Sequence, residues 1–166
     1  MASTLKINNL DTASGTEITV VSGKTIKAPG MVVQTLQFTA SEQTVSAGSG
    51  TTVINGTFNP KISGSKFAVW ASVPNCTATS GGSINVQSRL GTNSSPNSNT
   101  LIINVNERME GTGADDVRGI NAHDFGSFTC TGTGTHYASM VITPDNNTVV
   151  GRHSTTVKLL VQEIAQ

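Results

Sequence analysis

The chain has 166 residues, of which 12% are charged, and its ten basic and ten acidic residues give a formal net charge of zero. This balance excludes the basic field that holds nucleic acid and the polybasic stretch that holds a membrane surface. Polarity comes mostly from Ser, Thr and Asn, and the 17 Gly and 5 Pro favour strands joined by tight turns. The length predicts one domain plus a short arm.

Residues 1–30 carry apolar side chains in small groups separated by turn segments rich in Gly and Ser, a pattern that predicts very short strands. So few short strands cannot enclose a core, and other copies of the chain are the simplest cover for their apolar face. We therefore predict an oligomerisation and docking arm; the alternative is a terminal tail that never orders. The predicted contact residues of the arm are Leu5, Ile7, Leu10, Ile18, Val20 and Ile26.

Pro29 and Gly30 mark the predicted boundary between this arm and a head domain over residues 31–166. Proline fixes one backbone angle and glycine frees the next, which suits a turn between two units. The head contains eight predicted strands, with polar segments such as 41–50 and 109–126 predicted as loops. The predicted strands span residues 31–38, 51–58, 66–74, 83–90, 100–108, 125–130, 136–144 and 155–165.

The apolar pattern within two of these strands predicts their position in a sheet. In strand 31–38, Val32, Leu36 and Phe38 share one face with Gln34. Strand 66–74 is apolar on both faces, with Phe67, Val69, Ala71 and Val73 on one and Ala68 and Trp70 on the other. A strand of this kind is buried on both faces, so it lies centrally in a sheet or meets a neighbouring subunit.

The predicted fold class is all-β, because no segment shows helical periodicity over ten residues. Eight strands at this spacing are typical of a sandwich or a barrel. A two-sheet jelly roll is the most natural way to fold them. An immunoglobulin-like sandwich is the alternative, but its Cys, Trp, Cys order is absent because Trp70 precedes both Cys76 and Cys130.

The two cysteines, Cys76 and Cys130, are expected to be reduced and buried rather than bridged. The opening residues lack the charged start and apolar block of a secretory signal. No apolar run has the length of a membrane span. We therefore expect synthesis in the cytoplasm without a signal peptide, and no membrane insertion.

Candidate catalytic residues are few and match no known motif. His123 and Asp124 could act as a base with its orienting carboxylate, but their Gly-rich surroundings favour a solvated loop. The pair 115–116, both Asp, could hold a hard cation, although no calcium-loop pattern surrounds it. Glu107 and Glu110 could form a glycosidase pair, but their position at a strand end favours an ordinary surface role. We therefore expect no enzymatic activity, no cofactor and no metal.

Both ends of the chain resemble small fibre proteins of tailed bacteriophages, especially marine and cyanobacterial ones. The segments that carry the resemblance are the opening LKINNLDTASG at 5–15, the turn SGKT at 22–25, the strand start VVQ at 32–34 and the closing LVQEIA at 160–165. Val21 and Ser22 stand where such proteins usually have Val-Pro. The middle of the chain, about 40–150, matches only in its pattern of strands.

The resemblance implies a structural virion protein at the virion surface, a homotrimeric tail fibre or head fibre that can attach to the host surface. Its arm would lie at the particle and its β-sandwich head outward. Its implied partners are itself, other virion structural proteins, and a host-surface glycan or protein. A carbohydrate-binding module, expected to show a concave aromatic patch, is the alternative function. A polysaccharide-trimming enzyme, expected to show a carboxylate pair in a groove, is a third.

Overall fold

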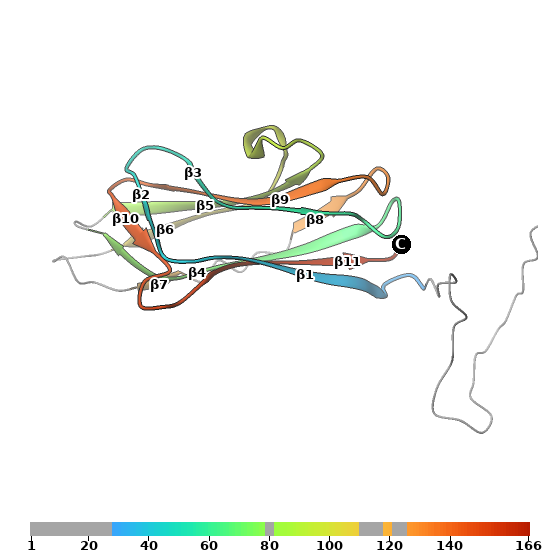
Figure 1. Ribbon diagram of the computed structural model, residues 1–166, viewed down its shortest axis with the longest axis horizontal. Coiled ribbons are helices and arrows are strands. Elements are labelled where there is room, and N and C mark those ends of the chain that lie inside the picture. The colour runs from blue at the N-terminus through green and yellow to red at the C-terminus, as the bar shows by residue number, and fades with distance from the viewer. Residues whose placement is uncertain (1–27, 79–81, 110–117, 121–125) are drawn as a thin grey trace, which may run out of the picture.

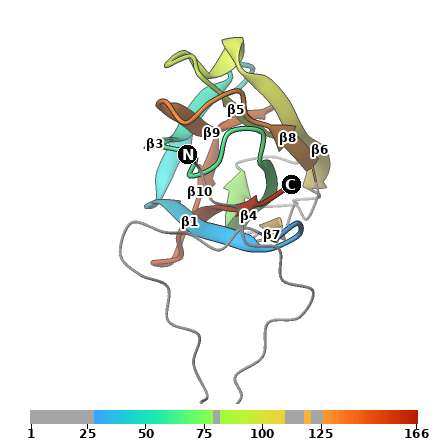
Figure 2. The ribbon, with the colours of Figure 1, turned by 90° about the vertical axis from the view of Figure 1, so that its right-hand side faces the viewer.

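A computed structural model describes residues 28–78, 82–109, 118–120 and 126–166. Within these residues the strands form two antiparallel sheets, one of seven strands and one of four, stacked as a sandwich (Figure 1). The view along the sandwich in Figure 2 shows the sheets wrapped around a shared interior. The predicted contact residues of the arm lie outside the described part of the chain.

The larger sheet has the order β1 (Val32–Ala40), β11 (Val157–Ile164), β4 (Lys66–Ala78), β10 (Thr148–Val150) and β2 (Gln43–Val45). Two further strands, β7 (Arg118–Ile120) and β8 (Gly126–Thr129), also pair with β4. The smaller sheet has the order β3 (Thr51–Phe58), β9 (His136–Pro144), β5 (Gly82–Gly91) and β6 (Thr100–Met109). A short 3₁₀ helix, Pro96–Ser98, lies between β5 and β6.

The main strands pair in a nested pattern: β1 with β11, β3 with β9, β4 with β8, and β5 with β6. Successive pairs alternate between the two sheets. A long antiparallel hairpin wrapped in this way is a jelly roll. The predicted all-β, jelly-roll-like sandwich is therefore confirmed. The immunoglobulin-like alternative is wrong, because β1 pairs with the last strand and not with the next one along the chain.

All eight predicted strands are present, as β1, β3, β4, β5, β6, β8, β9 and β11. The predicted bounds 51–58 and 136–144 coincide with β3 and β9. Three strands of three residues each, β2, β7 and β10, were not predicted. Such short strands show no alternation of their own. Their neighbours define them instead: β10 pairs with β2 on one side and with β4 on the other.

The hydrophobic core lies between the sheets, and β4 is its central strand. As predicted, β4 is buried on both faces: Phe67 and Val69 are at most 1% exposed, and so is Ala68 on the opposite face. Leu36 and Phe38 of β1 pack against this core. The prediction that Val32 shares their face is wrong. A register shift between Val32 and Gln34 reverses the alternation, so the Val32 side chain is 47% exposed.

A buried carboxylate joins three segments of the sandwich. Glu163 of β11 is fully buried, and its carboxylate accepts hydrogen bonds from the backbone N–H groups of Lys61 and Ile62 at 2.9–3.0 Å. The Ser65 hydroxyl donates to it at 2.7 Å, and the Gln34 side-chain amide of β1 donates at 2.5 Å. These bonds satisfy the buried charge and hold the β3–β4 connection against β1 and β11.

The two ends of the sandwich have different roles in the chain path. At the near end the chain enters at Ala28, and the backbone N–H of Gly30 donates to the Ala165 carbonyl at 2.9 Å. Gly30 has a φ of +83°, a turn conformation that glycine tolerates. At the far end lie the loops 46–50, 145–147 and 151–156. Since β1 has nine residues, the ends are about 30 Å apart at ~3.3 Å per residue. In Figure 1 the near end is on the right.

Replacing Glu163 with Ala is expected to lower the free energy of unfolding by about 3–5 kcal/mol, because the donors of Lys61, Ile62 and Ser65 then lose their buried acceptor. Urea denaturation of the purified chain measures this loss. The matched control is Glu107→Ala, since Glu107 is exposed on β6. Equal stability of the two variants would show that the Glu163 contacts do not hold the fold.

Both thiols are free and buried, as predicted. Burial raises the pKa of Cys76 to about 12, so the Cys76 thiol is protonated at neutral pH. The Cys130 thiol donates to the Ile62 carbonyl at 3.2 Å.

We expect a thiol reagent at neutral pH to modify Cys76 only after unfolding, because the thiolate is the reactive form. We also expect reductant to leave the melting temperature unchanged. Absorbance of the released thiol-reagent product, followed with and without denaturant, checks the first expectation. A fall of many degrees on reduction would instead indicate a bridge, since a disulfide typically contributes ~2–4 kcal/mol.

Candidate functional site

Of the candidate catalytic residues, only Glu107 lies within the described part of the chain. His123, Asp124, Glu110 and the Asp pair at 115–116 lie outside the described residues. Glu107 is an exposed residue of β6. Among the described residues, no group of three or more His, Cys, Asp or Glu side chains could hold a metal ion. Nor does any helix in the described ranges have the length and apolarity to cross a bilayer.

Three phenylalanine rings in the described part of the chain gather inside the sandwich. Phe58 and Phe67 have ring centroids 5.2 Å apart, and Phe67 lies 6.3 Å from Phe128. The buried His136 ring completes this cluster, 5.7 Å from Phe58, and its Nδ1 lies 2.9 Å from the Gly134 carbonyl oxygen. His136 therefore has a structural role at the near end, where β3 ends and β9 begins.

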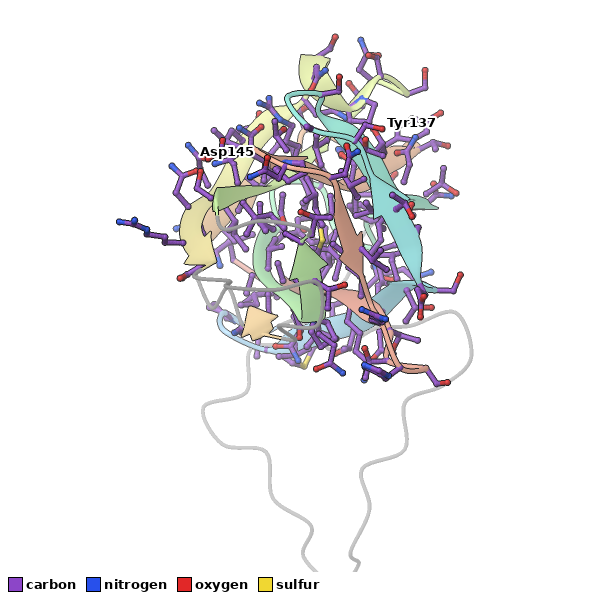
Figure 3. All side chains as sticks on the ribbon, turned by 90° about the vertical axis from the view of Figure 1, so that its left-hand side faces the viewer. Tyr137 and Asp145 are labelled. Atoms are coloured by element: carbon purple, nitrogen blue, oxygen red, sulfur yellow. The ribbon has the colours of Figure 1, made fainter. Side chains whose placement is uncertain are left out.

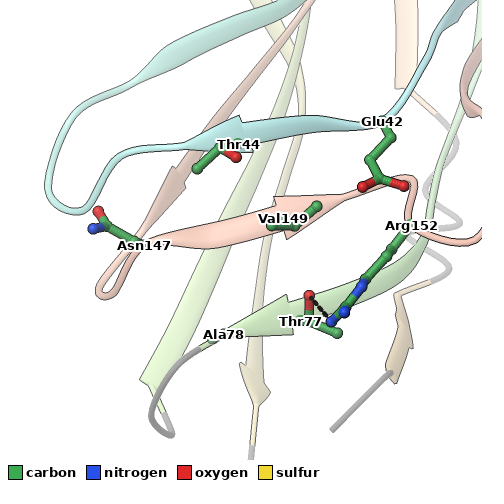
Figure 4. A pocket seen from close by; sticks show the side chains of 7 residues that line it. All are labelled: Glu42, Thr44, Thr77, Ala78, Asn147, Val149 and Arg152. Carbon is green, nitrogen blue, oxygen red and sulfur yellow. Dashed lines mark hydrogen bonds between the residues drawn. The ribbon is translucent and has the colours of Figure 1, made fainter. Parts of the chain in front are cut away.

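A polar groove lies at the far end, over the three neighbouring strands β2, β10 and β4. The strand register places Val149 beside both Thr44 and Thr77, so these three side chains form a row across the strands. The groove has a volume of about 330 Å³. Its lining consists of Glu42, Thr44, Thr77, Ala78, Asn147, Val149 and Arg152 (Figure 4).

Charged and polar groups stand at the two ends of this groove. Glu42 and Arg152 lie at one end and Asn147 at the other (Figure 4). The Nη1 group of Arg152 donates a hydrogen bond to the Thr77 hydroxyl at 3.3 Å. This bond directs the guanidinium along the groove. The Asn147 side-chain oxygen accepts from the backbone N–H of Ala47 at 2.9 Å. Hydrogen bonds therefore hold Arg152 and Asn147 in position at the two ends of the groove.

The turn that carries Arg152 is held in a costly backbone conformation. His153 and Ser154 have φ values of 59° and 60°, in the left-handed region that residues other than glycine rarely adopt. Asn75 of β4 is left-handed as well, with φ 50°, and its side-chain amide donates to the Arg152 carbonyl at 3.3 Å. The backbone N–H of Arg152 donates in turn to the Asn75 carbonyl at 3.2 Å. Such strain persists only where surrounding contacts enforce it.

A second hollow, of about 380 Å³, adjoins the same turn. It is lined mainly by hydroxyl groups, with one cation from Lys158: the lining residues are Ser72, Pro74, Ser154, Thr155, Thr156 and Lys158. The strained turn therefore separates two polar depressions at the far end.

Other loops of the far end are joined to one another by hydrogen bonds. The Asp145 carboxylate accepts from the Ser83 hydroxyl at 2.7 Å and from the Ser83 backbone N–H at 2.9 Å. The backbone N–H of Gly48 donates to the Pro144 carbonyl at 2.8 Å. Figure 3 views the molecule from this end and labels Asp145. These bonds order the polar surface around the groove.

The groove was not predicted from the sequence. Its residues come from three separated segments, 42–44, 77–78 and 147–152, and all three were predicted as loops or turns or left unassigned. Only the pairing of β2, β10 and β4 brings them together. The single Gly151 before Arg152 is a weak turn signal, and it does not indicate what the turn faces.

Comparisons with known proteins found structural matches of low sequence identity and no family. No protein-family model and no curated protein sequence matches the chain. Among solved structures, that of the infectious bursal disease virus Gt strain matches 90% of this chain with 11% identity and a TM-score of 0.40. The VP2 subviral particle of the same virus matches 90% with 9% identity and a TM-score of 0.41. In both cases the match spans 42% of the other chain.

Hydrogen bonds from the Ser83 side chain and then from its backbone N–H lower the pKa of Asp145 below its ordinary value of 3.8. Stability from this group is therefore present above the ordinary pKa and is lost as pH falls through the lowered one. We expect Ser83→Ala to raise the pKa of Asp145 part of the way back, because the backbone bond remains. NMR titration of the carboxyl carbon measures the shift. An unchanged Asp145 titration in the variant would show that the hydroxyl bond is absent in solution.

Proposed function

We propose that this chain is a structural virion protein, a homotrimeric fibre on the tail or capsid of a bacteriophage. Residues 1–30 form its oligomerisation and docking arm, and residues 31–166 form a head that faces outward and attaches to the host surface. The proposed role is not catalytic and uses no cofactor. The proposed partners are two further copies of the chain, other virion structural proteins, and a glycan or protein of the host.

The observation that carries this proposal is that the chain enters the sandwich at one end and that the groove lies at the other. Residues 1–27 join the head at Ala28, at the near end, where Gly30 pairs with Ala165. The groove lies at the opposite end, together with the loops 46–50, 145–147 and 151–156. If the arm docks to the particle, this far end points away from it and is the part of the head that meets a host surface.

The two segments of the fibre resemblance that the structure describes meet in the fold. The VVQ segment lies in β1 and the LVQEIA segment lies in β11, which are paired neighbours. Their polar members, Gln34 and Glu163, form the 2.5 Å hydrogen bond at the buried carboxylate. Two short motifs at opposite ends of the chain thus contribute to one structural contact, which supports reading them as a fold signature.

Trimer formation is supported by the apolar pattern of the arm and by one described side chain. Val32 is 47% exposed and lies at the near end, beside the point where the arm joins. Copies assembled around the arm would cover this valine together with the arm's own apolar face. Contact between copies would therefore explain why an apolar side chain is exposed at the bulge in β1.

The alternative functions have less support among the described residues. A sugar module that grips its ligand by stacking needs surface aromatic rings, whereas Phe58, Phe67 and Phe128 cluster inside. A polysaccharide-trimming enzyme needs a carboxylate pair across a groove. The far-end groove contains the carboxylate of Glu42 opposite the cation of Arg152, a combination suited to binding rather than to acid–base hydrolysis.

Light scattering tests the trimer and the arm in one experiment. The full chain is expected to show three times its 17.2 kDa mass, since the apolar arm needs cover. A variant that lacks residues 1–30 is expected to be a soluble, β-rich monomer and to be absent from assembled particles.

A full chain that stays folded as a monomer at high dilution would contradict the trimer. Normal incorporation of the deletion variant into particles would contradict the docking role. A deletion variant that fails to fold would show that arm and head are one cooperative unit, against the proposed division at residue 30.

A further inference from the structure

We propose that the far-end groove of β2, β10 and β4 is a binding site for one neutral hexopyranose unit of a host-surface glycan. The inference rests on the proposed function for the origin of the sugar, and on the groove itself for the ligand class. It assigns recognition to Glu42, Arg152 and Asn147, around the apolar side chain of Val149.

The size of the groove limits the ligand to a small one. Its volume of about 330 Å³ lies at the lower end of the ~300–1,000 Å³ range typical of small-molecule sites. Its length is set by a row that crosses only three strands, from Thr44 through Val149 to Thr77. One sugar ring, with the rest of the glycan leaving through the open side, fits these dimensions better than a long oligosaccharide.

The lining groups complement sugar hydroxyls. A hydroxyl both donates and accepts, so it can bridge an acceptor-only carboxylate and a donor-only guanidinium. Glu42 and Arg152 provide this combination at one end of the groove, and the Asn147 amide lies at the other (Figure 4). Between them, Val149 offers an apolar surface for the C–H groups of a ring. Recognition by this groove therefore relies on hydrogen bonds and needs no stacked aromatic ring.

The charges of the groove favour a neutral ligand. The Glu42 carboxylate opposes an acidic sugar, and the Arg152 guanidinium opposes an amino sugar. Both charges lie at the same end of the groove (Figure 4). A neutral ring with adjacent hydroxyls can use both of them at once, because charge-assisted hydrogen bonds to either sign are stronger than neutral ones.

The groove is organised before any ligand arrives. Bonds to Asn75 hold the backbone of Arg152, and Thr77 accepts from its guanidinium at 3.3 Å. The strained residues His153 and Ser154 follow directly in the chain. Pre-ordered side chains lose less entropy on binding, and local strain of this kind clusters at ligand sites.

Saturation-transfer difference NMR on the full chain tests the site, with the methyl glycosides of glucose, galactose and mannose as neutral probes. Glucuronic acid and glucosamine serve as charged comparators. At least one neutral glycoside is expected to bind, more tightly than either charged sugar. Glu42→Gln and Arg152→Ala are each expected to weaken it by roughly tenfold, the effect of losing one charge-assisted hydrogen bond.

The matched control variants are Glu107→Gln and Arg108→Ala, which change the same residue types at exposed positions of β6 and are expected to bind normally. Glu42 is exposed, so its isosteric variant keeps the fold, and thermal melting verifies this for every variant. Absence of binding by all neutral probes, preference for a charged sugar, or full binding by both groove variants would overturn the proposal.

Light scattering on the same samples separates this proposal from the proposed function. A monomer that binds the neutral glycoside through the groove would retain the binding site and contradict the fibre. A trimer that binds none of the neutral probes would retain the fibre and contradict the binding site.

Discussion

The buried carboxylate of Glu163 is the contact on which the arrangement of the sandwich depends. A charge removed from water is tolerated only when hydrogen bonds replace its hydration, and here the donors come from the β3–β4 connection and from β1. That connection carries the chain from the smaller sheet to the larger one. One side chain therefore fixes the crossing between the sheets and the pairing of the first and last strands, and both belong to the nested order of a jelly roll.

The near and far ends of the head are held together by different kinds of contact. At the near end a dense set of internal contacts, namely the Glu163 bonds and the aromatic cluster around Phe67, surrounds the point where the chain enters. At the far end the polar groups face outward, and backbone bonds between loops, rather than a core, set their positions. Loops supported in this way can change their exposed side chains without disturbing the interior.

The low content of charged residues in the chain gives the few charges in the groove more weight. With so few charged residues, a single carboxylate and a single guanidinium dominate the chemistry of a small depression. Arg152 reaches the groove only because Asn75 holds the following turn in a left-handed conformation that costs free energy. Low aromatic content shapes the interior as well: the rings of Phe58, Phe67 and Phe128 pack against one another between the sheets.

The sequence by itself determined the fold class, the eight main strands and the central place of β4, because period-two alternation and two-faced apolarity are local properties of a strand. It also indicated buried, unbridged cysteines. Only the tertiary structure decided the strand order, the exposure of Val32 and the short strands β2, β7 and β10. The groove belongs to this second group, since Glu42, Thr77 and Arg152 are distant in the chain and pairing alone brings them together. A three-residue strand has too few positions to show a period, so its existence depends on the neighbours that accept its hydrogen bonds.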